Sequence, residues 1–331
     1  MKLSFFIFMF IIAKTLCGDT LSIIKTRGYL LCGANGNFPG FSLVKNKKWS
    51  GLDVDYCRAL AVAIFNNEKK VKFIKVSNKK KFEDLINFKY DVLVRNTTWT
   101  FERDTSMSVK FAGVTYYDGQ GFLILKDFGL NSALELNNAH ICIADNSTGK
   151  RNVDYFFKKH NMKYKAILNT EDLSIIDFEK GRCDVITNDK SKLYSIKSTL
   201  KEPSAYKVLP ETISKEPFGP VVRNHDDNWL DITKWVLFVL LEAEELNINK
   251  KNAFLFIDSK NPRIQKFLGL NDSIETMHGL DNGWSYNVIS KIGNYKDIFD
   301  KNLINNMGLN IDRGLNALWN RGGIMYPLPI K

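Results

Sequence analysis

Apolar and polar positions along the chain follow two patterns that alternate, one with the period of a strand and one with the period of a helix. In the first part of the chain we expect strands at 28–33, 71–76 and 90–94 and helices at 53–64 and 82–88. Asp53 is expected to cap the first of these helices, because a carboxylate can accept from the free N–H groups at a helix start. The β-α-β-α-β order is typical of a mainly parallel sheet with helices on both faces.

The same order returns later in the chain. Strands are predicted at 141–144, 164–168 and 183–186, and helices at 151–160 and 173–180. The chain has 331 residues, which fits two units at about 150 residues each. We therefore predict an α/β protein with two lobes.

Two extended runs, at 122–125 and 217–222, are the expected crossings between the lobes. They assign 19–124 and 219–331 to lobe one and 125–218 to lobe two. The run at 235–241 is apolar all round, but charged residues flank it and it is short, which predicts a buried core helix rather than a membrane span.

The first eighteen residues predict a secretory signal peptide. A basic start at Lys2 precedes an unbroken apolar run at 5–13, and small residues follow near Gly18. A spanning helix needs about 20 apolar residues, so this run is too short to be one. We expect export, with a periplasmic location for the mature chain.

Removal of 1–18 leaves four cysteines, Cys32, Cys57, Cys142 and Cys183. An even number in an exported chain predicts disulfides. Three connectivities are possible, and local pairing would give Cys32–Cys57 and Cys142–Cys183, one bridge in each half. Four reduced, buried thiols are the alternative.

The formal net charge of +11 raises the question of nucleic acid. The lysines are scattered and often stand beside asparagine, and neither zinc-finger spacing nor an RNA-recognition aromatic motif is present. We expect no nucleic-acid partner, and interpret the lysines as a solvated surface. Attraction to an anionic membrane surface stays open.

Polar clusters follow three of the predicted strands, at 95–104, 145–149 and 187–189. In open α/β sheets, ligands bind beyond the carboxyl ends of the strands, so these clusters are the candidate site. The four histidines lie outside them, and no nucleophile–base or metal-ligand arrangement emerges. We expect no cofactor and no metal.

Several ordered segments carry a resemblance to a known family. They are Gly51-Leu52-Asp53-Val54-Asp55-Tyr56-Cys57-Arg58, Arg95-Asn96-Thr97-Thr98-Trp99-Thr100, the run at 111–122, Ser214-Lys215-Glu216-Pro217 and the run at 313–319. The chain resembles bacterial solute-binding proteins of the polar amino-acid ABC transporter family (family 3), in particular their longer general L-amino-acid-binding branch. The resemblance implies a type II periplasmic-binding-protein fold, with two parallel-type sheets, flanking helices and two crossover segments. It also implies a monomer that captures free L-amino acids and delivers them to an inner-membrane ABC permease.

The resemblance assigns roles to two charged residues. The family's carboxylate-binding arginine ends a Thr-x-Thr-x-x-Arg stretch, which here ends at Arg103, and a guanidinium can bind a carboxylate through two parallel bonds. Asp189 matches the acid that receives the ligand's ammonium. A surface salt bridge for Arg103 and a helix cap for Asp189 are the alternatives, and Arg95 is expected to pair structurally.

The remaining candidates come from both lobes. By the same resemblance, Asn96 and Thr98 supply acceptor and donor groups from lobe one and Thr148 a donor from lobe two. Phe38 and Phe41 match an aromatic wall against the ligand's side chain, with core packing as the alternative.

An enzyme is the competing interpretation, since dehydratases of prephenate- or arogenate-type substrates share this fold. The absence of a catalytic constellation favours a binding protein, and we predict no enzymatic activity.

Overall fold

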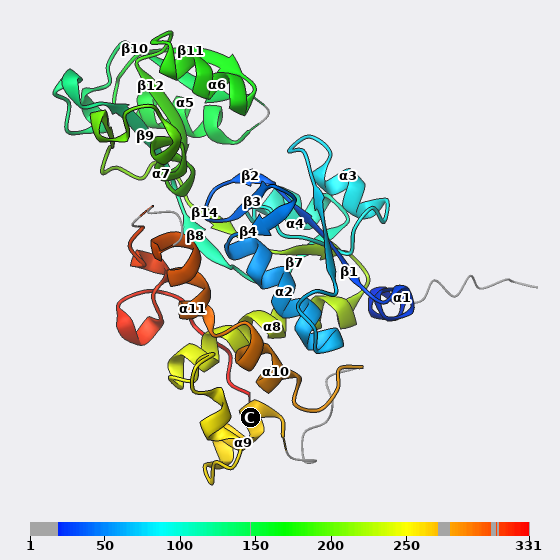
Figure 1. The fold of residues 1–331 in the computed structure, drawn as a ribbon. Helices are drawn as coiled ribbons and strands as arrows, with labels where there is room; N and C mark the ends of the chain where they lie inside the picture. The colour runs from blue at the N-terminus through cyan, green and yellow to red at the C-terminus, as the bar shows by residue number, and fades with distance from the viewer. Residues whose placement is uncertain (1–18, 146, 271–278, 306–308, 310, 331) are drawn as a thin grey trace, which may run out of the picture.

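The computed structural model describes residues 19–145, 147–270, 279–305, 309 and 311–330, and they form two lobes (Figure 1). Each lobe is built on a five-stranded sheet with helices packed against it. The predicted two-lobed α/β fold is thereby confirmed. The predicted signal peptide at 1–18 and Asn146 lie outside the described residues.

Lobe one holds the sheet of order β5-β1-β6-β15-β7. Its strands are β1 (Leu30–Ala34), β5 (Val71–Lys75), β6 (Val92–Leu93), β7 (Val109–Phe111) and β15 (Val221–Arg223). Strand β1 pairs in parallel with β5 and β6, whereas β15 is antiparallel to its neighbours. A small antiparallel sheet of β2 (Asn37–Phe38), β3 (Ser42–Lys45) and β4 (Lys48–Ser50) follows β1.

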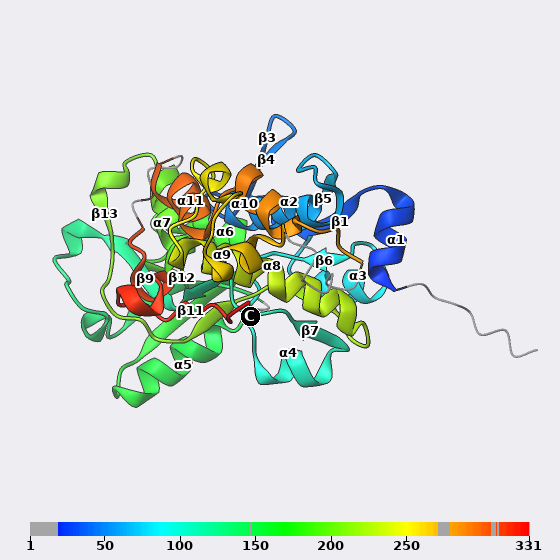
Figure 2. The same cartoon turned by 90° about the horizontal axis from the view of Figure 1, so that it is seen from below.

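Helices of lobe one cover this sheet and extend below it (Figures 1 and 2). They are α1 (Thr20–Arg27), α2 (Leu52–Phe65), α3 (Lys81–Ile86), α4 (Phe101–Ser106), α8 (Asp227–Glu245), α9 (Pro262–Leu268), α10 (Trp284–Lys291) and α11 (Tyr295–Phe299). The expected core helix at 235–241 lies within α8, where Val236, Leu237 and Leu240 are buried. Within the described ranges, no helix is long and apolar enough to span a membrane.

The start of α2 differs from the prediction. Gly51, not Asp53, occupies the cap position, with φ of 130°, and a Cβ there would lie 2.0 Å from the carbonyl oxygen of Phe41. Asp53 lies in the first turn, and its carboxylate accepts from the Asn96 main-chain N–H at 3.3 Å. The Asp53 carboxylate therefore points into the lobe, where it holds the loop that follows β6.

Lobe two holds the sheet of order β11-β10-β12-β9-β13. Its strands are β9 (Gln120–Leu125), β10 (Ala139–Ala144), β11 (Tyr164–Asn169), β12 (Val185–Asp189) and β13 (Tyr206–Val208), and its helices are α5 (Gly149–Lys159), α6 (Glu171–Glu179) and α7 (Lys190–Thr199). Strand β10 is parallel to β11 and β12, and β9 is antiparallel to β12.

The predicted first crossing at 122–125 is wrong, because these residues form β9 inside the lobe-two sheet. Phe122 and Ile124 face the core with α5, whereas Leu123 faces the opposite core with α7. A central strand is apolar on both sides because both faces of its sheet are covered. A crossing segment can have the same apolar sequence, so the pattern alone did not distinguish the two.

The crossing is instead made by two paired strands, β8 (Tyr116–Asp118) and β14 (Glu216–Phe218), which are antiparallel. The outer edge of β8 is covered by Asn316, whose side chain accepts from the Tyr117 N–H at 2.6 Å and donates to the Tyr117 carbonyl at 3.0 Å. Of the run predicted as the return crossing, 217–222, the first residues lie in β14 and the last in β15 of the lobe-one sheet.

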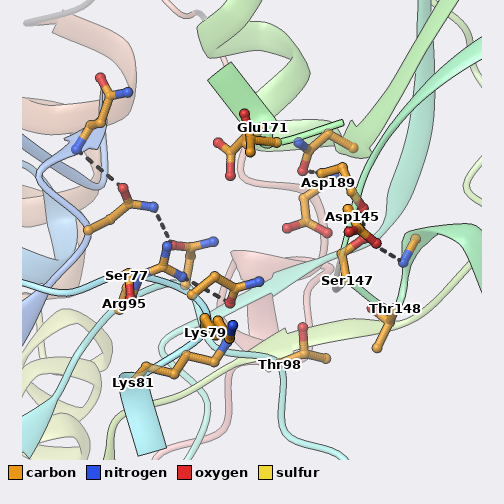
Figure 3. Close-up of a pocket in the computed structure, with 18 of the residues that line it drawn as sticks. Ser77, Lys79, Lys81, Arg95, Thr98, Asp145, Ser147, Thr148, Glu171 and Asp189 are labelled. Atoms are coloured by element: carbon orange, nitrogen blue, oxygen red, sulfur yellow. Dashed lines mark hydrogen bonds between the residues drawn. The ribbon is translucent and has the colours of Figure 1, made fainter. Parts of the chain in front are cut away.

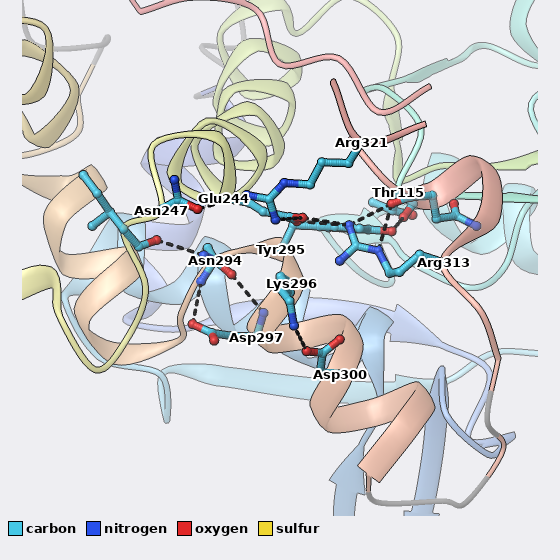
Figure 4. A network of polar contacts seen from close by, with 12 residues as sticks. Thr115, Glu244, Asn247, Asn294, Tyr295, Lys296, Asp297, Asp300, Arg313 and Arg321 are labelled. Atoms are coloured by element: carbon cyan, nitrogen blue, oxygen red, sulfur yellow. Dashed lines mark hydrogen bonds and ion pairs between the residues drawn. The ribbon is translucent and has the colours of Figure 1, made fainter. Parts of the chain in front are cut away.

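A polar network attaches the C-terminal part of the chain to lobe one (Figure 4). The guanidinium of Arg313 donates to both carboxylate oxygens of Glu244, at 3.1 and 3.0 Å, and to the carbonyl of Asn316 at 2.8 Å. The Tyr295 hydroxyl donates to the Thr115 carbonyl at 2.7 Å. These contacts place the last segment beside the crossing strands.

The two disulfides pair as the local connectivity predicts. Cys32 of β1 is bonded to Cys57 of α2, and Cys142 of β10 is bonded to Cys183 just before β12. Each bridge therefore lies within one lobe and leaves the connection between the lobes unconstrained.

Candidate functional site

A cleft of about 670 Å³ lies between the lobes, at the carboxyl ends of the parallel strands of both sheets (Figure 3). All three of the predicted polar clusters contribute to it, from the ends of β6, β10 and β12. The sheets face each other through these ends, where loops and helix starts leave polar groups exposed.

Arg103 lies on the lobe-one wall, in the first turns of α4. Thr100 caps this helix by accepting from the Arg103 N–H at 3.3 Å, and the Arg103 guanidinium donates to the Thr98 carbonyl at 2.7 Å. Within the described part of the chain, no acidic side chain forms an ion pair with Arg103. The expected alternative of a surface salt bridge is therefore absent there, and the guanidinium also lies 5.7 Å from the centroid of the Phe82 ring.

Asn96 and Thr98 also line the cleft, but both already have partners. The Asn96 side-chain oxygen accepts from Asn35 at 3.2 Å. The Thr98 hydroxyl donates to Glu216 at 2.6 Å. The Thr98 hydroxyl proton is thus committed to Glu216, so its predicted role as a donor requires that bond to break.

Asp189 lies on the opposite wall, at the end of β12 and the start of α7. Its carboxylate makes no capping bond to α7, and no described group donates a hydrogen bond to it. Burial raises the pKa of Asp189 well above the usual range, and the neighbouring carboxylates of Asp118 and Glu216 raise it further. A cation placed here would be stabilised by three nearby acids.

Thr148 lines the same lobe-two wall, directly before α5. Its side chain makes no capping bond, whereas the neighbouring Ser147 hydroxyl accepts from the Gly149 N–H at 3.1 Å and donates to the Ala144 carbonyl at 2.7 Å. The structure thus brings Thr148 to the cleft and leaves its hydroxyl without a helix-capping role.

Phe38 and Phe41 do not line the cleft, and here the predicted aromatic wall needs correction. Both rings are fully buried and stack on each other with centroids 4.5 Å apart. Phe41 also meets Tyr116 and Phe218 edge-on, at 4.9 and 6.3 Å. The two rings pack in the lobe-one core beneath the crossing strands, which was the alternative explanation for these residues.

Arg95 is held by main-chain and side-chain oxygens, as the expectation of a structural role implied. Its guanidinium donates to the Val76 carbonyl at 2.9 Å and to the Asn78 side chain at 3.4 Å. It nevertheless lines the cleft, and burial lowers its pKa while Glu171 and Asp53 oppose that shift.

Sequence reasoning missed several cleft residues because they lie outside the three clusters. Lys81 reaches the cleft from the start of α3, and Gln120 and Glu216 reach it from the lobe-two end of the paired strands β8 and β14, where both accept from the Asn152 side chain. Glu216 stood in a segment that carried the resemblance, but nothing in that segment indicated its contact with Thr98. Its position depends on the crossing, which only the tertiary structure reveals.

Direct contacts also join the two walls. The Asn37 side chain donates to Asp172 at 3.1 Å, and Lys192 donates to the Asn37 carbonyl at 2.9 Å. Lys192 also forms an ion pair with Glu171 at 2.7 Å. Asn37 belongs to lobe one, whereas Glu171, Asp172 and Lys192 belong to lobe two, so the two Asn37 contacts join the lobes across the cleft.

The charges of the cleft are sorted by lobe. Lobe one contributes cations and lobe two contributes anions, namely Lys75, Lys79, Lys81, Arg95 and Arg103 on one side and Asp145, Glu171, Asp172 and Asp189 on the other. Figure 3 shows Lys81 and Arg95 across the cleft from Asp189 and Glu171. Such an arrangement can hold a molecule with an anionic group at one end and a cationic group at the other.

A comparison with protein families settles the affiliation of the chain. Residues 30–252 match the model of the bacterial extracellular solute-binding proteins, family 3. The chain belongs to this family. The matched range spans both lobes and the crossing strands, and the C-terminal part that follows packs on lobe one of this family 3 protein.

Individual relatives extend over nearly the full length of this family 3 chain. The general L-amino acid-binding periplasmic protein AapJ of Rhizobium johnstonii is 44% identical over 324 residues, covering 96% of this chain and 95% of the relative. The glutamate/glutamine/aspartate/asparagine-binding protein BztA of Rhodobacter capsulatus is 40% identical over 324 residues, covering 97% and 96%. A solved structure, an ABC transporter periplasmic binding protein from Brucella ovis with glutathione bound, superposes with a TM-score of 0.92 at 43% identity, covering 95% and 100%.

Proposed function

We propose that this protein is the periplasmic substrate-binding component of an ABC importer that captures free L-amino acids. The observation that carries the proposal is that Arg103 lines one wall of the cleft and Asp189 lines the opposite wall. A guanidinium with an open side suits the α-carboxylate, and a carboxylate without a donor suits the α-ammonium. The names of the relatives AapJ and BztA support the same class of ligand.

The mechanism we propose is capture followed by lobe closure. The ligand's carboxylate binds lobe one and its ammonium binds lobe two, so the ligand stabilises the closed arrangement over the open one. The antiparallel strands β8 and β14 form the hinge, and each disulfide stiffens one lobe without crossing it. The closed form then docks on an inner-membrane permease, and no bond of the ligand is made or broken.

Export through cleavage of residues 1–18 is part of this proposal. The family is extracellular, and an oxidising compartment is where two disulfides form. Binding-protein relatives support transport rather than the dehydratase alternative.

The proposal is tested by the thermal stability of purified mature protein with each of the twenty L-amino acids. A ligand that binds only the folded state raises the free energy of unfolding by about 2.7 kcal/mol at 100 times its Kd. We expect a subset to raise the Tm, and analogues that lack either the α-carboxylate or the α-ammonium to have no effect. Folded protein whose Tm responds to no amino acid would contradict the proposal.

Delivery to a permease is tested in cells. We expect deletion of the gene to abolish uptake of the amino acids found in the stability screen, and the wild-type gene to restore it. A gene carrying Arg103→Met should restore the protein but not the uptake. Uptake unchanged by the deletion would argue against the transport role.

A further inference from the structure

Lys81 is the first residue of α3, and it places its ammonium at the lobe-one wall of the cleft (Figure 3). The side chain is only 5% exposed. Within the described residues, no oxygen accepts a hydrogen bond from this ammonium, which lies 5.3 Å from the centroid of the Phe82 ring. A buried ammonium without an acceptor is costly, and here it faces a space that a ligand enters.

The two arginines of this wall have other partners. Arg95 is anchored on Val76 and Asn78, and Arg103 is left for the ligand's α-carboxylate. Burial lowers the pKa of Lys81 well below its usual range, and the charges of Arg103 and Arg95 lower it further, while Asp189 opposes them. The Lys81 side chain therefore remains as a buried donor that a second carboxylate of a ligand can meet at this wall.

We propose that the preferred ligand carries a second carboxylate, which pairs with the Lys81 ammonium while the α-carboxylate binds Arg103. This inference rests on the proposed function and names the ligand class of the same site. The shared chemistry is one ammonium and two carboxylates. A dicarboxylic amino acid has it, and so does a small peptide of the glutathione type.

The size of the cleft accommodates both. Ligand pockets measure about 300–1,000 Å³, and this one, at about 670 Å³, exceeds what a single small amino acid fills. The two sources differ in length, so affinity for each is measured separately.

The experiment is titration calorimetry with L-glutamate, L-aspartate, glutathione and L-glutamine, the neutral counterpart of L-glutamate. The proteins are the wild type, Lys81→Met and Lys80→Met. Lys80 is the matched control, since it directly precedes Lys81 but is exposed and does not line the cleft. In the wild type we expect L-glutamate, L-aspartate or glutathione to bind more tightly than L-glutamine, and whichever binds tightest identifies the source.

In Lys81→Met we expect the affinity for the dicarboxylic ligand to fall about thirtyfold or more, as for removal of one partner of a buried charge pair. Affinity for L-glutamine should change less than about threefold, as should every affinity of Lys80→Met, because an exposed charge outside the cleft contributes little. The wild-type comparison tests the proposal even where the variant does not fold.

Two results would overturn it. One is wild-type protein that prefers L-glutamine to all three dicarboxylic ligands, and the other is an equal loss for L-glutamate and L-glutamine in folded Lys81→Met. Neither result would contradict amino-acid binding, so the proposed function would stand in both cases. Wild-type protein that binds none of the four, nor any other amino acid, would overturn the proposed function and this inference with it.

Discussion

At the scale of single residues, one main-chain carbonyl, that of Thr98, holds the Arg103 guanidinium at the cleft. The Thr100 cap fixes the start of the same short helix. Arg103 lines the cleft and has no acidic ion-pair partner among the described residues, so a ligand carboxylate meets a side chain that is already held in place.

We therefore expect Arg103→Met to weaken every amino-acid ligand by about 2–5 kcal/mol, since all share the α-carboxylate. Arg103→Lys should also bind weakly, because an ammonium cannot make two parallel bonds to a carboxylate. Calorimetry with the ligands found in the stability screen measures both. Wild-type affinity in the folded Met variant would show that the carboxylate binds elsewhere.

Asp53 offers a test of electrostatics inside lobe one. Burial raises the pKa of Asp53 from 3.8 to about 7, although the Asn96 N–H and Arg95 favour the charged form. The folded state then binds more protons than the unfolded state between these values, so stability falls as pH rises from about 4 to 7 and is level above.

Asp53→Asn keeps an oxygen for the Asn96 N–H and removes the titration. Relative to this variant, the wild type should lose up to about 1.4 kcal/mol of unfolding free energy per pH unit across that window. Denaturant unfolding of both proteins between pH 4 and 8 measures the difference. If the difference in unfolding free energy between the two proteins did not change with pH, Asp53 would have the same pKa in the folded and unfolded states.

At the scale of elements, an ion pair between Arg313 and the buried Glu244 attaches the C-terminal segment to α8. Glu244 of α8 is 3% exposed and receives two bonds from Arg313, while Arg321 reaches only 4.0 Å from it. The Arg313 guanidinium also lies over the rings of Tyr295 and Phe299, at 5.2 and 4.7 Å.

We expect Arg313→Met to destabilise the protein by about 3 kcal/mol, because it leaves the Glu244 carboxylate buried without its main partner. Arg321→Met is the matched control and should cost less than about 1 kcal/mol, since that guanidinium is exposed and distant. Chemical denaturation compares the two. Equal effects would show that Glu244 does not depend on Arg313.

At the scale of the whole molecule, few direct bonds join the cleft walls. Asn37 bonds to Asp172 and to Lys192, and the hinge strands carry the rest of the connection. A ligand that bonds to both lobes therefore contributes a large share of what holds them together, and only a ligand with both charges does so.

Asp189→Asn keeps the shape of the cleft but removes the anion that faces the ligand's ammonium. We expect this variant to bind weakly and to remain open on average, with an unliganded Tm close to that of the wild type. Small-angle scattering should show contraction of the wild type, but not of the variant, at a matched, non-saturating concentration of a preferred amino acid. Equal contraction of both would contradict the bridging role of Asp189.

The local sequence pattern determined much of the fold and of the site of this protein. The alternation of strands and helices predicted two α/β lobes, and the polar residues after the strands at 90–94, 141–144 and 183–186 predicted one edge of each sheet as the site. These predictions succeed because a parallel strand must be apolar along its length and end at the same edge as its neighbours. Even the disulfide pairing, one of three connectivities, follows once each half is a separate lobe.

What only the tertiary structure decided is where a residue faces once segments far apart in the chain meet. Phe38 and Phe41 carry the same side chains whether they line a cleft or a core, and burial beneath the crossing strands placed them in the core. Residues 122–125 are apolar both as a crossing and as a central strand. Lys81 resembles any surface lysine in the sequence, yet the folded chain leaves it only 5% exposed and places it at the cleft. Burial and proximity arise from contacts across the whole fold, and no local pattern encodes them.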